Sequence, residues 1–324
     1  MISIAMTTYN GEKYLREQLD SILNQTFSDF ELIICDDCSK DATVKILEEY
    51  SLNDKRVRYF VNEKNLGFKK NFEKAISLCS GEYVAFSDQD DIWLPEKLEE
   101  SITHIGNNNL LCSNSLLIDE NGNSLNLTYK ECAGLNRYFP NDYEFRFKHI
   151  LIWNFVQGAS VLAKKDFLLQ NMPIPENLVY HDYYFGVIAQ MQNSLIYYDK
   201  VLAKYRQHTT QQTENKKASF NIFKRYQRKD YDDINNAKNI LTRNDFPFQF
   251  KSYVEDYIKY NEYMNNNKNF FTLSFYSKNY IYFTLDKNKF HKVIHICKRI
   301  ISIILFKIKR LFLLLSLYII QLYM

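Results

Sequence analysis

Residues that break regular secondary structure are scarce in this sequence. It has 8 glycines and 5 prolines among 324 residues, which excludes a collagen-like or low-complexity chain. The six cysteines show no even spacing, so a framework of disulfide bonds is not expected. The first residues contain neither a basic segment nor a long apolar run, and we therefore expect no signal peptide and a reducing, cytoplasmic setting.

The chain also has little excess charge of either sign, because 41 Lys and Arg residues face 38 Asp and Glu residues. Residues 287–324, however, hold eight Lys or Arg and no acidic residue; since the whole chain carries +3, the preceding residues carry −5. Hydrophobic residues make up 46% of the chain, enough for a large core in one or two domains. We therefore expect a mildly acidic globular body followed by a basic segment.

Apolar runs and helical periods alternate over the first hundred residues. Strands are expected at residues 2–6, 30–35, 57–61 and 83–87, and helices at 14–23, 41–50 and 68–78. This alternation favours a doubly wound, mostly parallel α/β sheet flanked by helices. The later pattern is looser, with strands expected at 110–118, 155–163 and 195–205 and a helix at 181–191. Composition changes after residue 212, which predicts a domain of residues 1–215 and a helical region of residues 216–324.

Polar residues follow three of the expected strands. They are Thr7-Thr8-Tyr9-Asn10, Asp36-Asp37 and Asp88-Gln89-Asp90-Asp91. In doubly wound sheets the ligand site lies at the carboxyl ends of the strands, so these loops are expected on one rim. The carboxylates of Asp88 and Asp90 suit Mg²⁺ or Mn²⁺, which in turn bind nucleotide phosphates. The alternative is a solvated acidic turn at the start of the helix near Pro95.

Cys35 and Cys38 have the CxxC spacing of redox and zinc sites. Such a site would need a helix N-terminus or a second cysteine pair, and the sequence has neither. We therefore interpret the two cysteines as small residues that flank Asp36 and Asp37.

Together these motifs resemble those of inverting family 2 glycosyltransferases, which have the GT-A fold. The carrying residues are Thr7-Thr8-Tyr9-Asn10-Gly11, Gln25-Thr26-Phe27, Glu31 to Asp41, Asn65-Leu66-Gly67, Gly81-Glu82-Tyr83 and Asp88 to Leu98. The resemblance covers about two-thirds of the chain and does not reach the last hundred residues. Cys38 departs from the small residue that is usual before Ser39. The run Tyr205-Arg206-Gln207-His208 looks most like that of rhamnosyltransferase-type members.

The resemblance implies a set of contacts to a nucleoside-diphosphate sugar. Asp37 would hydrogen-bond the base, and Thr7 and Tyr9 would line its pocket. Lys70 or Asn71 would approach the base or the diphosphate.

A second set of residues would hold the diphosphate and the metal ion. By the same resemblance, Asp88 and Asp90 form the DxD pair, which binds Mg²⁺ or Mn²⁺ and the ribose-diphosphate. Arg206 and His208 would offset the charge that develops on the leaving group, and His208 could also ligate the metal. The alternative for Arg206 and His208 is a polar strand end.

The acceptor side is expected around His181 and Asp182, which resemble the second acidic motif of the family. An inverting transfer is a single displacement, so one base must take the acceptor proton, and we assign Asp182 to this role. The alternative is that Asp182 caps the following helix. His181 and Trp93 are expected to line the acceptor pocket.

The basic tail, residues 287–324, has helical periodicity. Most of its His, Lys and Arg residues fall on one face and most of its apolar residues fall opposite. Its final apolar run, residues 311–323, is shorter than the roughly twenty residues that a spanning helix needs. We expect an amphipathic helix that lies on an anionic membrane surface; a core-packing or dimerising helix is the alternative.

These observations predict a metal-dependent inverting glycosyltransferase. It would act in surface polysaccharide synthesis, with rhamnose as a candidate donor sugar and a glycan or lipid-linked glycan as acceptor. Its expected location is the inner face of the cell membrane, as a peripheral protein, and no nucleic-acid partner is expected. A nucleotidyltransferase and a catalytically inactive, membrane-docked binding module are the alternatives.

Overall fold

The computed structural model describes residues 1–132, 143–152, 154–176, 178, 180–208, 237–255 and 258–259. The chain divides into two compact units, residues 1–268 and 269–324, and all described residues belong to the first. The predicted boundary at residue 215 and the basic tail at residues 287–324 lie outside the described residues, so both stay predictions. No helix of the described part is long and apolar enough to cross a bilayer.

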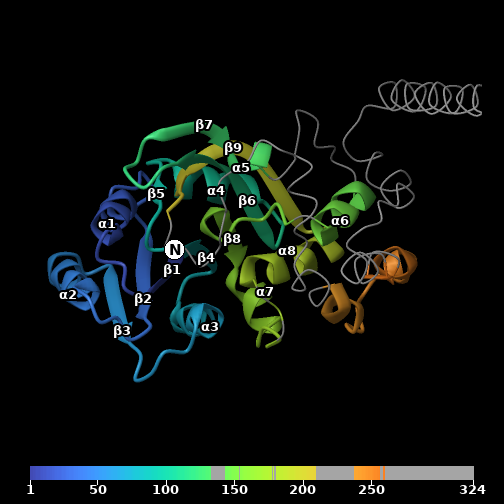
Figure 1. The fold of residues 1–324 in the computed structure, drawn as a ribbon, viewed down its shortest axis with the longest axis horizontal. Helices are drawn as coiled ribbons and strands as arrows, with labels where there is room; N and C mark the ends of the chain where they lie inside the picture. Colours follow the sequence, from blue (N-terminus) through green and yellow to red (C-terminus); the bar gives the residue numbers. More distant parts are fainter. Residues whose placement is uncertain are drawn as a thin grey trace, which may run out of the picture. The chain divides into compact units, whose positions relative to one another are not determined.

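The first half of the sheet is built from alternating strands and helices. In chain order these are β1 (Ile2–Thr8), α1 (Leu15–Leu23), β2 (Phe30–Asp36), α2 (Thr43–Asn53), β3 (Val57–Val61), α3 (Phe68–Leu78) and β4 (Tyr83–Ser87). Parallel pairing gives the order β3-β2-β1-β4, drawn in blue shades in Figure 1. The predicted strands at residues 57–61 and 83–87 and the predicted helix at residues 68–78 are confirmed with these bounds.

The second half of the sheet is mixed. Its elements are β5 (Ile92–Trp93), α4 (Lys97–Ile105), β6 (Leu110–Ile118), β7 (Ser124–Thr128), α5 (Tyr129–Cys132), α6 (Tyr143–Ile152), η1 (Gly158–Ser160), β8 (Val161–Lys164), α7 (Lys165–Gln170), α8 (His181–Met191), β9 (Leu195–Arg206) and η2 (Phe248–Phe250). Within the described residues, nine strands form one sheet in the order β3-β2-β1-β4-β8-β6-β9-β5, with β7 on β6. β6 and β9 are parallel, whereas β8 runs antiparallel to both β4 and β6.

The predicted α/β class, with helices flanking the sheet, is therefore confirmed, and the parallel order holds for the first four strands. The strand expected at residues 155–163 begins only at Val161. A 3₁₀ turn precedes it, closed by a hydrogen bond from the Ser160 N–H to the Gln157 oxygen. This turn lies at the edge of the site described below.

Apolar spacing explains how the helices attach to the sheet. On α1 the buried side chains Leu15, Leu19 and Ile22 recur three or four residues apart, and they join Ile4 and Leu32 of the sheet in one core cluster. Burying each such side chain contributes about 1.5–3 kcal/mol. This core fixes the strands whose carboxyl ends form the site.

The described segment 237–255 packs on the same unit through aromatic and polar contacts. The ring of Phe250 lies 4.4 Å from that of Phe147 on α6. Arg243 donates a hydrogen bond from Nη1 to the Tyr184 hydroxyl on α8 at 3.1 Å. These contacts attach the segment to α6 and to α8, the helix that carries Asp182.

Candidate active site

The carboxyl ends of β1, β2 and β4 meet at one edge of the sheet. In the parallel register Thr8 lies opposite Asp36, and Met6 lies opposite Ser87. The Thr8 hydroxyl donates to Asp36 Oδ2 at 2.8 Å, and the Asp37 N–H donates to the Thr8 carbonyl at 2.8 Å. The three polar loops predicted to share one rim therefore start side by side.

Asp37 is buried and organises the loop before α3. Its Oδ1 accepts hydrogen bonds from the side chain of Asn62 and the N–H of Leu66, and its Oδ2 accepts from the N–H of Gly67. Gly67 has a φ of 78°, in the left-handed region that glycine adopts most readily. A carboxylate has about four lone-pair sites, so these three donors leave room for one more partner such as a base N–H.

The loop after β1 presents an exposed aromatic ring. Tyr9 has 43% of its surface exposed, which is high for so large a side chain at the end of a buried strand. Its main chain is tied to the DxD loop, since the Tyr9 N–H donates to Gln89 Oε1 and Gln89 Nε2 donates to the Tyr9 carbonyl. Thr7 precedes it on β1, opposite Cys35 of β2.

Lys70 and Asn71 differ sharply in their surroundings. Asn71 is buried; it donates to the Cys35 carbonyl at 2.7 Å and accepts from Asn62 at 2.8 Å. Lys70 is 40% exposed and forms an ion pair with Glu73 at 2.9 Å. Of the two, Lys70 is the residue whose charge can reach a ligand, while Asn71 holds α3 against the end of β2.

The acidic loop after β4 concentrates negative charge. Burial, together with the charges of Asp90 and Asp182, raises the pKa of Asp88 to about 7. Asp91 is fully buried, and burial and its acidic neighbours raise its pKa well above the usual value, while its Oδ1 accepts a hydrogen bond from the Arg206 N–H. Asp91 therefore attaches the acidic loop to the end of β9.

Asp182 reaches this loop from the first turn of α8. Its Oδ2 accepts from the Gly158 N–H at 2.9 Å, and its Oδ1 accepts from the Tyr183 N–H at 2.6 Å and from Asn154 at 3.3 Å. Burial raises its pKa to about 6, although these donors favour the charged form. The helix begins at His181, with Tyr180 at the cap position, so Asp182 is not its N-cap.

Arg206, at the end of β9, and His208, just after it, both contact the acidic loop. The His208 ring nitrogen Nε2 lies 2.8 Å from Asp90 Oδ2, and both side chains are largely buried. Arg206 donates from Nε to the main-chain oxygen of Asp90 at 2.8 Å. The ring of Tyr14 packs against both, 4.7 Å from the Arg206 guanidinium and 4.9 Å from the His208 ring.

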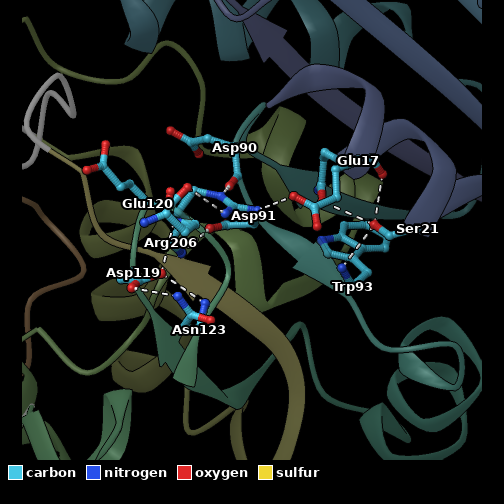
Figure 2. Close-up of polar contacts among 11 residues, drawn as sticks. Glu17, Ser21, Asp90, Asp91, Trp93, Asp119, Glu120, Asn123 and Arg206 are labelled. Carbon is cyan, nitrogen blue, oxygen red and sulfur yellow. Dashed lines mark hydrogen bonds and ion pairs between the residues drawn. The ribbon is translucent and has the colours of Figure 1, made fainter. Parts of the chain in front are cut away.

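Arg206 contacts several elements around the acidic loop. Only 1% of its surface is exposed, and its guanidinium also pairs with Glu17 of α1 and donates to the Glu120 oxygen in the β6–β7 turn. Figure 2 shows the Arg206 side chain near these partners and the main-chain oxygen of Asp90, while the Arg206 main-chain N–H donates to the Asp91 carboxylate. Arg206 therefore joins the acidic loop to other elements, and its expected role toward a diphosphate stays a prediction.

The two residues expected to line the acceptor pocket are both buried. Trp93 is 2% exposed and belongs to the core cluster, with the Lys97 Nζ 4.8 Å above its ring. His181 is 6% exposed and stacks on Phe72 at 4.0 Å, with Phe86 nearby. Burial lowers the pKa of His181 to about 3, so the ring is neutral. Both rings are buried in this structure, so their contact with an acceptor stays a prediction.

Several supporting residues were missed by the sequence analysis. Glu17, Tyr14, Asn154 and Gly158 all contact the predicted site residues. Nothing in the local pattern marks Glu17 or Asn154, because their partners are distant in sequence. Gly158 could have been noticed as a glycine inside an expected strand. In the structure a Cβ there would lie 3.7 Å from Asp182 Oδ2 and 3.3 Å from His181 Nε2.

The cysteine and metal expectations can also be compared with the structure. Cys35 and Cys38 are free thiols, and Cys38 donates to the Asn62 oxygen. Across the described ranges, no three His, Cys, Asp or Glu side chains are arranged to hold a metal ion. Mg²⁺ is commonly bound by one or two carboxylates plus substrate phosphates, and Asp88 and Asp90 offer this donor set.

The comparison with known families decides the assignment. The sequence model described as glycosyl transferase family 2 matches residues 3–168. The chain belongs to this family. An uncharacterised glycosyltransferase of Methanocaldococcus jannaschii is 34% identical over 217 residues, covering 64% of this chain and 70% of that protein. The dTDP-rhamnosyl transferase RfbG of Shigella flexneri is 30% identical over 213 residues, covering 64% of this chain and 73% of RfbG.

Solved structures support the fold of this glycosyltransferase. TarS of S. aureus (residues 1–349, with UDP-GlcNAc) superposes with a TM-score of 0.54 at 21% identity, covering 86% of this chain and 75% of that one. A mannosyltransferase of Pyrobaculum calidifontis, solved with GDP-Man and Mn²⁺, gives 0.53 at 13% identity, covering 79% and 68%. At these identities the likeness concerns the fold, which is the GT-A type.

Proposed function

We propose that this glycosyltransferase moves a sugar from a nucleoside-diphosphate sugar to a hydroxyl of a glycan or lipid-linked glycan, with inversion. One observation carries the proposal: Asp182, from α8, lies close enough to the Asp88–Asp90 loop for its charge to raise the pKa of Asp88. This electrostatic proximity supports a proposed base beside a proposed donor-binding loop. A single displacement needs this arrangement, because the acceptor proton is removed as the anomeric carbon is attacked.

Asp182 is the proposed base. The Gly158 and Tyr183 N–H groups hold its two oxygens, which fixes the direction of the carboxylate. With a pKa of about 6, it is mostly ionised at neutral pH, yet basic enough to accept a proton from a hydroxyl under attack. It would deliver that proton to solvent after the transfer.

Mg²⁺ or Mn²⁺ is the proposed cofactor. Asp88 and Asp90 would hold it together with the substrate phosphates, with His208 beside Asp90 as a further candidate ligand, and the fit rests on the accumulation of acidic side chains there, which raises the pKa of Asp88 and favours a bound cation. When bound, such an ion neutralises the charge that develops on the departing diphosphate. The chain's own residues bind and orient the donor: Tyr9 by stacking on the base, and Asp37 by accepting a hydrogen bond from it.

The donor sugar and the pathway are proposed from the relatives. RfbG is named as a dTDP-rhamnosyl transferase, and an Escherichia coli relative, 32% identical over 168 residues, is named as a glucosyltransferase that acts on a diphosphoundecaprenol-linked sugar. We therefore place this protein in surface polysaccharide synthesis, with dTDP-rhamnose as the first donor to test. A peripheral position on the inner face of the membrane, through residues 287–324, is part of the same proposal.

A donor panel tests the proposal. The purified protein is incubated with Mn²⁺ and each of dTDP-rhamnose, UDP-glucose, UDP-GlcNAc and GDP-mannose, and release of the nucleoside diphosphate is measured with lipid-linked sugar acceptors. Release from one donor, dependent on acceptor, is expected. Release of pyrophosphate from a nucleoside triphosphate would indicate a nucleotidyltransferase instead, and no turnover with any donor would favour a binding module.

A further inference from the structure

Gln89, the middle residue of Asp88-Gln89-Asp90, contacts the loop after β1. Gln89 lies between Asp88 and Asp90, but its side-chain amide bonds the main chain of Tyr9 in both directions. The Tyr9 N–H donates to Gln89 Oε1 at 2.8 Å, and Gln89 Nε2 donates to the Tyr9 carbonyl at 3.1 Å. One side chain thus fastens the loop after β1 to the loop after β4.

Gly11 makes room for this contact. A Cβ at Gly11 would lie 2.2 Å from Gln89 Oε1 and 2.6 Å from its Cδ, and the three nearest atoms all belong to the Gln89 amide. Gly11 is not among the glycines with positive φ, so its backbone conformation admits an alanine. Glycine at this position is therefore required by Gln89 rather than by a turn.

We propose that Gln89 is a positioning residue that sets the distance between the base pocket at Tyr9 and the carboxylates of Asp88 and Asp90. The inference rests on the proposed function, in which Tyr9 stacks on the base while the two carboxylates hold the metal and diphosphate. Since Gln89 is part of the loop that carries both carboxylates, a movement of its amide separates the two halves of the donor site.

The two halves bind one molecule, so their spacing determines affinity. When a ligand spans two subsites, the second contact forms at a high effective concentration only if the geometry permits both at once. Loss of the Gln89 contact should therefore weaken ligands that reach both loops. It should leave unchanged a ligand that reaches only the metal and the carboxylates.

Three variants test this inference: Gln89→Met, which keeps the volume and removes both hydrogen bonds; Gly11→Ala, which displaces the amide; and the double variant. Gly11→Ala should fold, because the atoms it meets are the end of a flexible side chain. Calorimetry with Mn²⁺ measures the Kd of UDP, dTDP and GDP, and of pyrophosphate. Gln192→Met, at the end of α8 far from Gln89 in sequence and outside the two loops, is the matched control.

Each single variant should weaken the nucleoside diphosphate that the wild type binds best by about five- to thirty-fold, since a net hydrogen bond is worth about fivefold. Pyrophosphate binding should stay within about twofold, because it uses one subsite. The double variant should lose no more than the single ones, because both changes remove the same contact.

Additive losses in the double variant, or equal losses for pyrophosphate and the nucleoside diphosphate, would overturn the inference while the donor site stands. A wild-type protein that binds none of the three nucleoside diphosphates would overturn the proposed function and this inference with it. If Gly11→Ala fails to fold, Gln89→Met alone decides through the pyrophosphate comparison.

Discussion

The guanidinium of Arg206 holds the main chain of Asp90. Its Nε donates to the Asp90 carbonyl at 2.8 Å, while Nη1 donates to the Glu120 carbonyl at 3.2 Å. The same side chain pairs with Glu17 of α1. One buried cation therefore joins the acidic loop, a helix and the β6–β7 turn, and two residues later His208 contacts the Asp90 carboxylate.

Arg206→Met should destabilise the protein by about 1–3 kcal/mol, because the part-buried main-chain oxygens of Asp90 and Glu120 lose their donor, while Glu17, which is 53% exposed, loses its ion-pair partner. Arg206→Lys should recover only part of this loss, since an ammonium cannot make the same set of directed hydrogen bonds. Chemical denaturation measures both. Arg16→Met on α1 is the control: its ion pair with Glu49 is solvent-exposed, so its loss should change the stability little. Equal losses for the two arginines would contradict the supporting role of Arg206.

Asp88→Ala and Asp90→Ala should abolish transfer and weaken donor binding in Mn²⁺, because they remove the carboxylates proposed to bind the metal and the doubly charged diphosphate. Activity assays with a Mn²⁺ titration and donor calorimetry measure the two effects. Asp199→Ala, which removes a carboxylate that is 51% exposed, is the control and should leave both unchanged. Full wild-type activity in EDTA would remove the metal from the proposal.

Asp182→Asn should remove transfer and leave donor affinity nearly unchanged, since the amide cannot accept the proton. In the wild type, kcat/KM should fall as the pH drops below about 6, where Asp182 becomes protonated. Asn154→Ala should move this limb to higher pH, because the Asn154 hydrogen bond favours the charged carboxylate.

The fold of Asp182→Asn can be checked through linkage. Because burial raises the folded-state pKa of Asp182 above its value of 3.8, the charged group costs stability above pH 6, and this cost disappears as the pH falls toward 4. The variant should therefore be at least as stable as the wild type at pH 8. Wild-type turnover in a folded Asp182→Asn protein would exclude this residue as the base.

Much of the sheet and the rim could be predicted because local patterns determine them. The apolar runs at residues 57–61 and 83–87 are strands with those bounds, and polar residues that follow parallel strands must meet at one edge. The helix at His181–Met191 was equally visible from its apolar residues. In each case residues close in sequence supply the information.

The surroundings of other residues could not be predicted, because they depend on contacts between residues far apart in sequence. Trp93 and His181 stand beside acidic motifs, which suggested a ligand pocket, but whether a ring faces ligand or core depends on what packs against it. For His181 that is Phe72, from a helix about a hundred residues earlier. Arg206 was assigned to the diphosphate for the same reason, and its partner Glu17 comes from α1. Such contacts follow from tertiary packing, which local sequence does not encode.

The His181→Leu variant should lose less stability than the wild type when the pH is lowered from 6.5 to 5. Burial among phenylalanine rings lowers the folded-state pKa of His181 to about 3 from an ordinary 6.5. Its contribution is therefore complete above pH 6.5 and is lost as the pH falls, because the unfolded chain then binds the additional proton. Between pH 6.5 and 5 the wild type should lose about 2 kcal/mol more than the variant. Urea denaturation at the two pH values measures this, with the surface substitution His104→Leu as control; a variant that loses as much as the wild type would contradict the buried neutral histidine.

Deleting residues 287–324, which lie outside the described residues, should release the protein from anionic membranes. The segment carries eight Lys or Arg and no acidic residue, and each cation near an anionic surface contributes about 1 kcal/mol. Its apolar face adds burial in the interface, so moderate salt should weaken the attachment without abolishing it.

Co-sedimentation with vesicles that contain anionic lipid compares the full chain, the truncated chain and a Lys307→Gln, Lys309→Gln, Arg310→Gln variant. The triple variant should pellet less than the full chain, and neutral vesicles should retain little of any form. Equal pelleting of the full and truncated chains would refute docking, and unfolding of the truncated chain would assign the tail to the protein core.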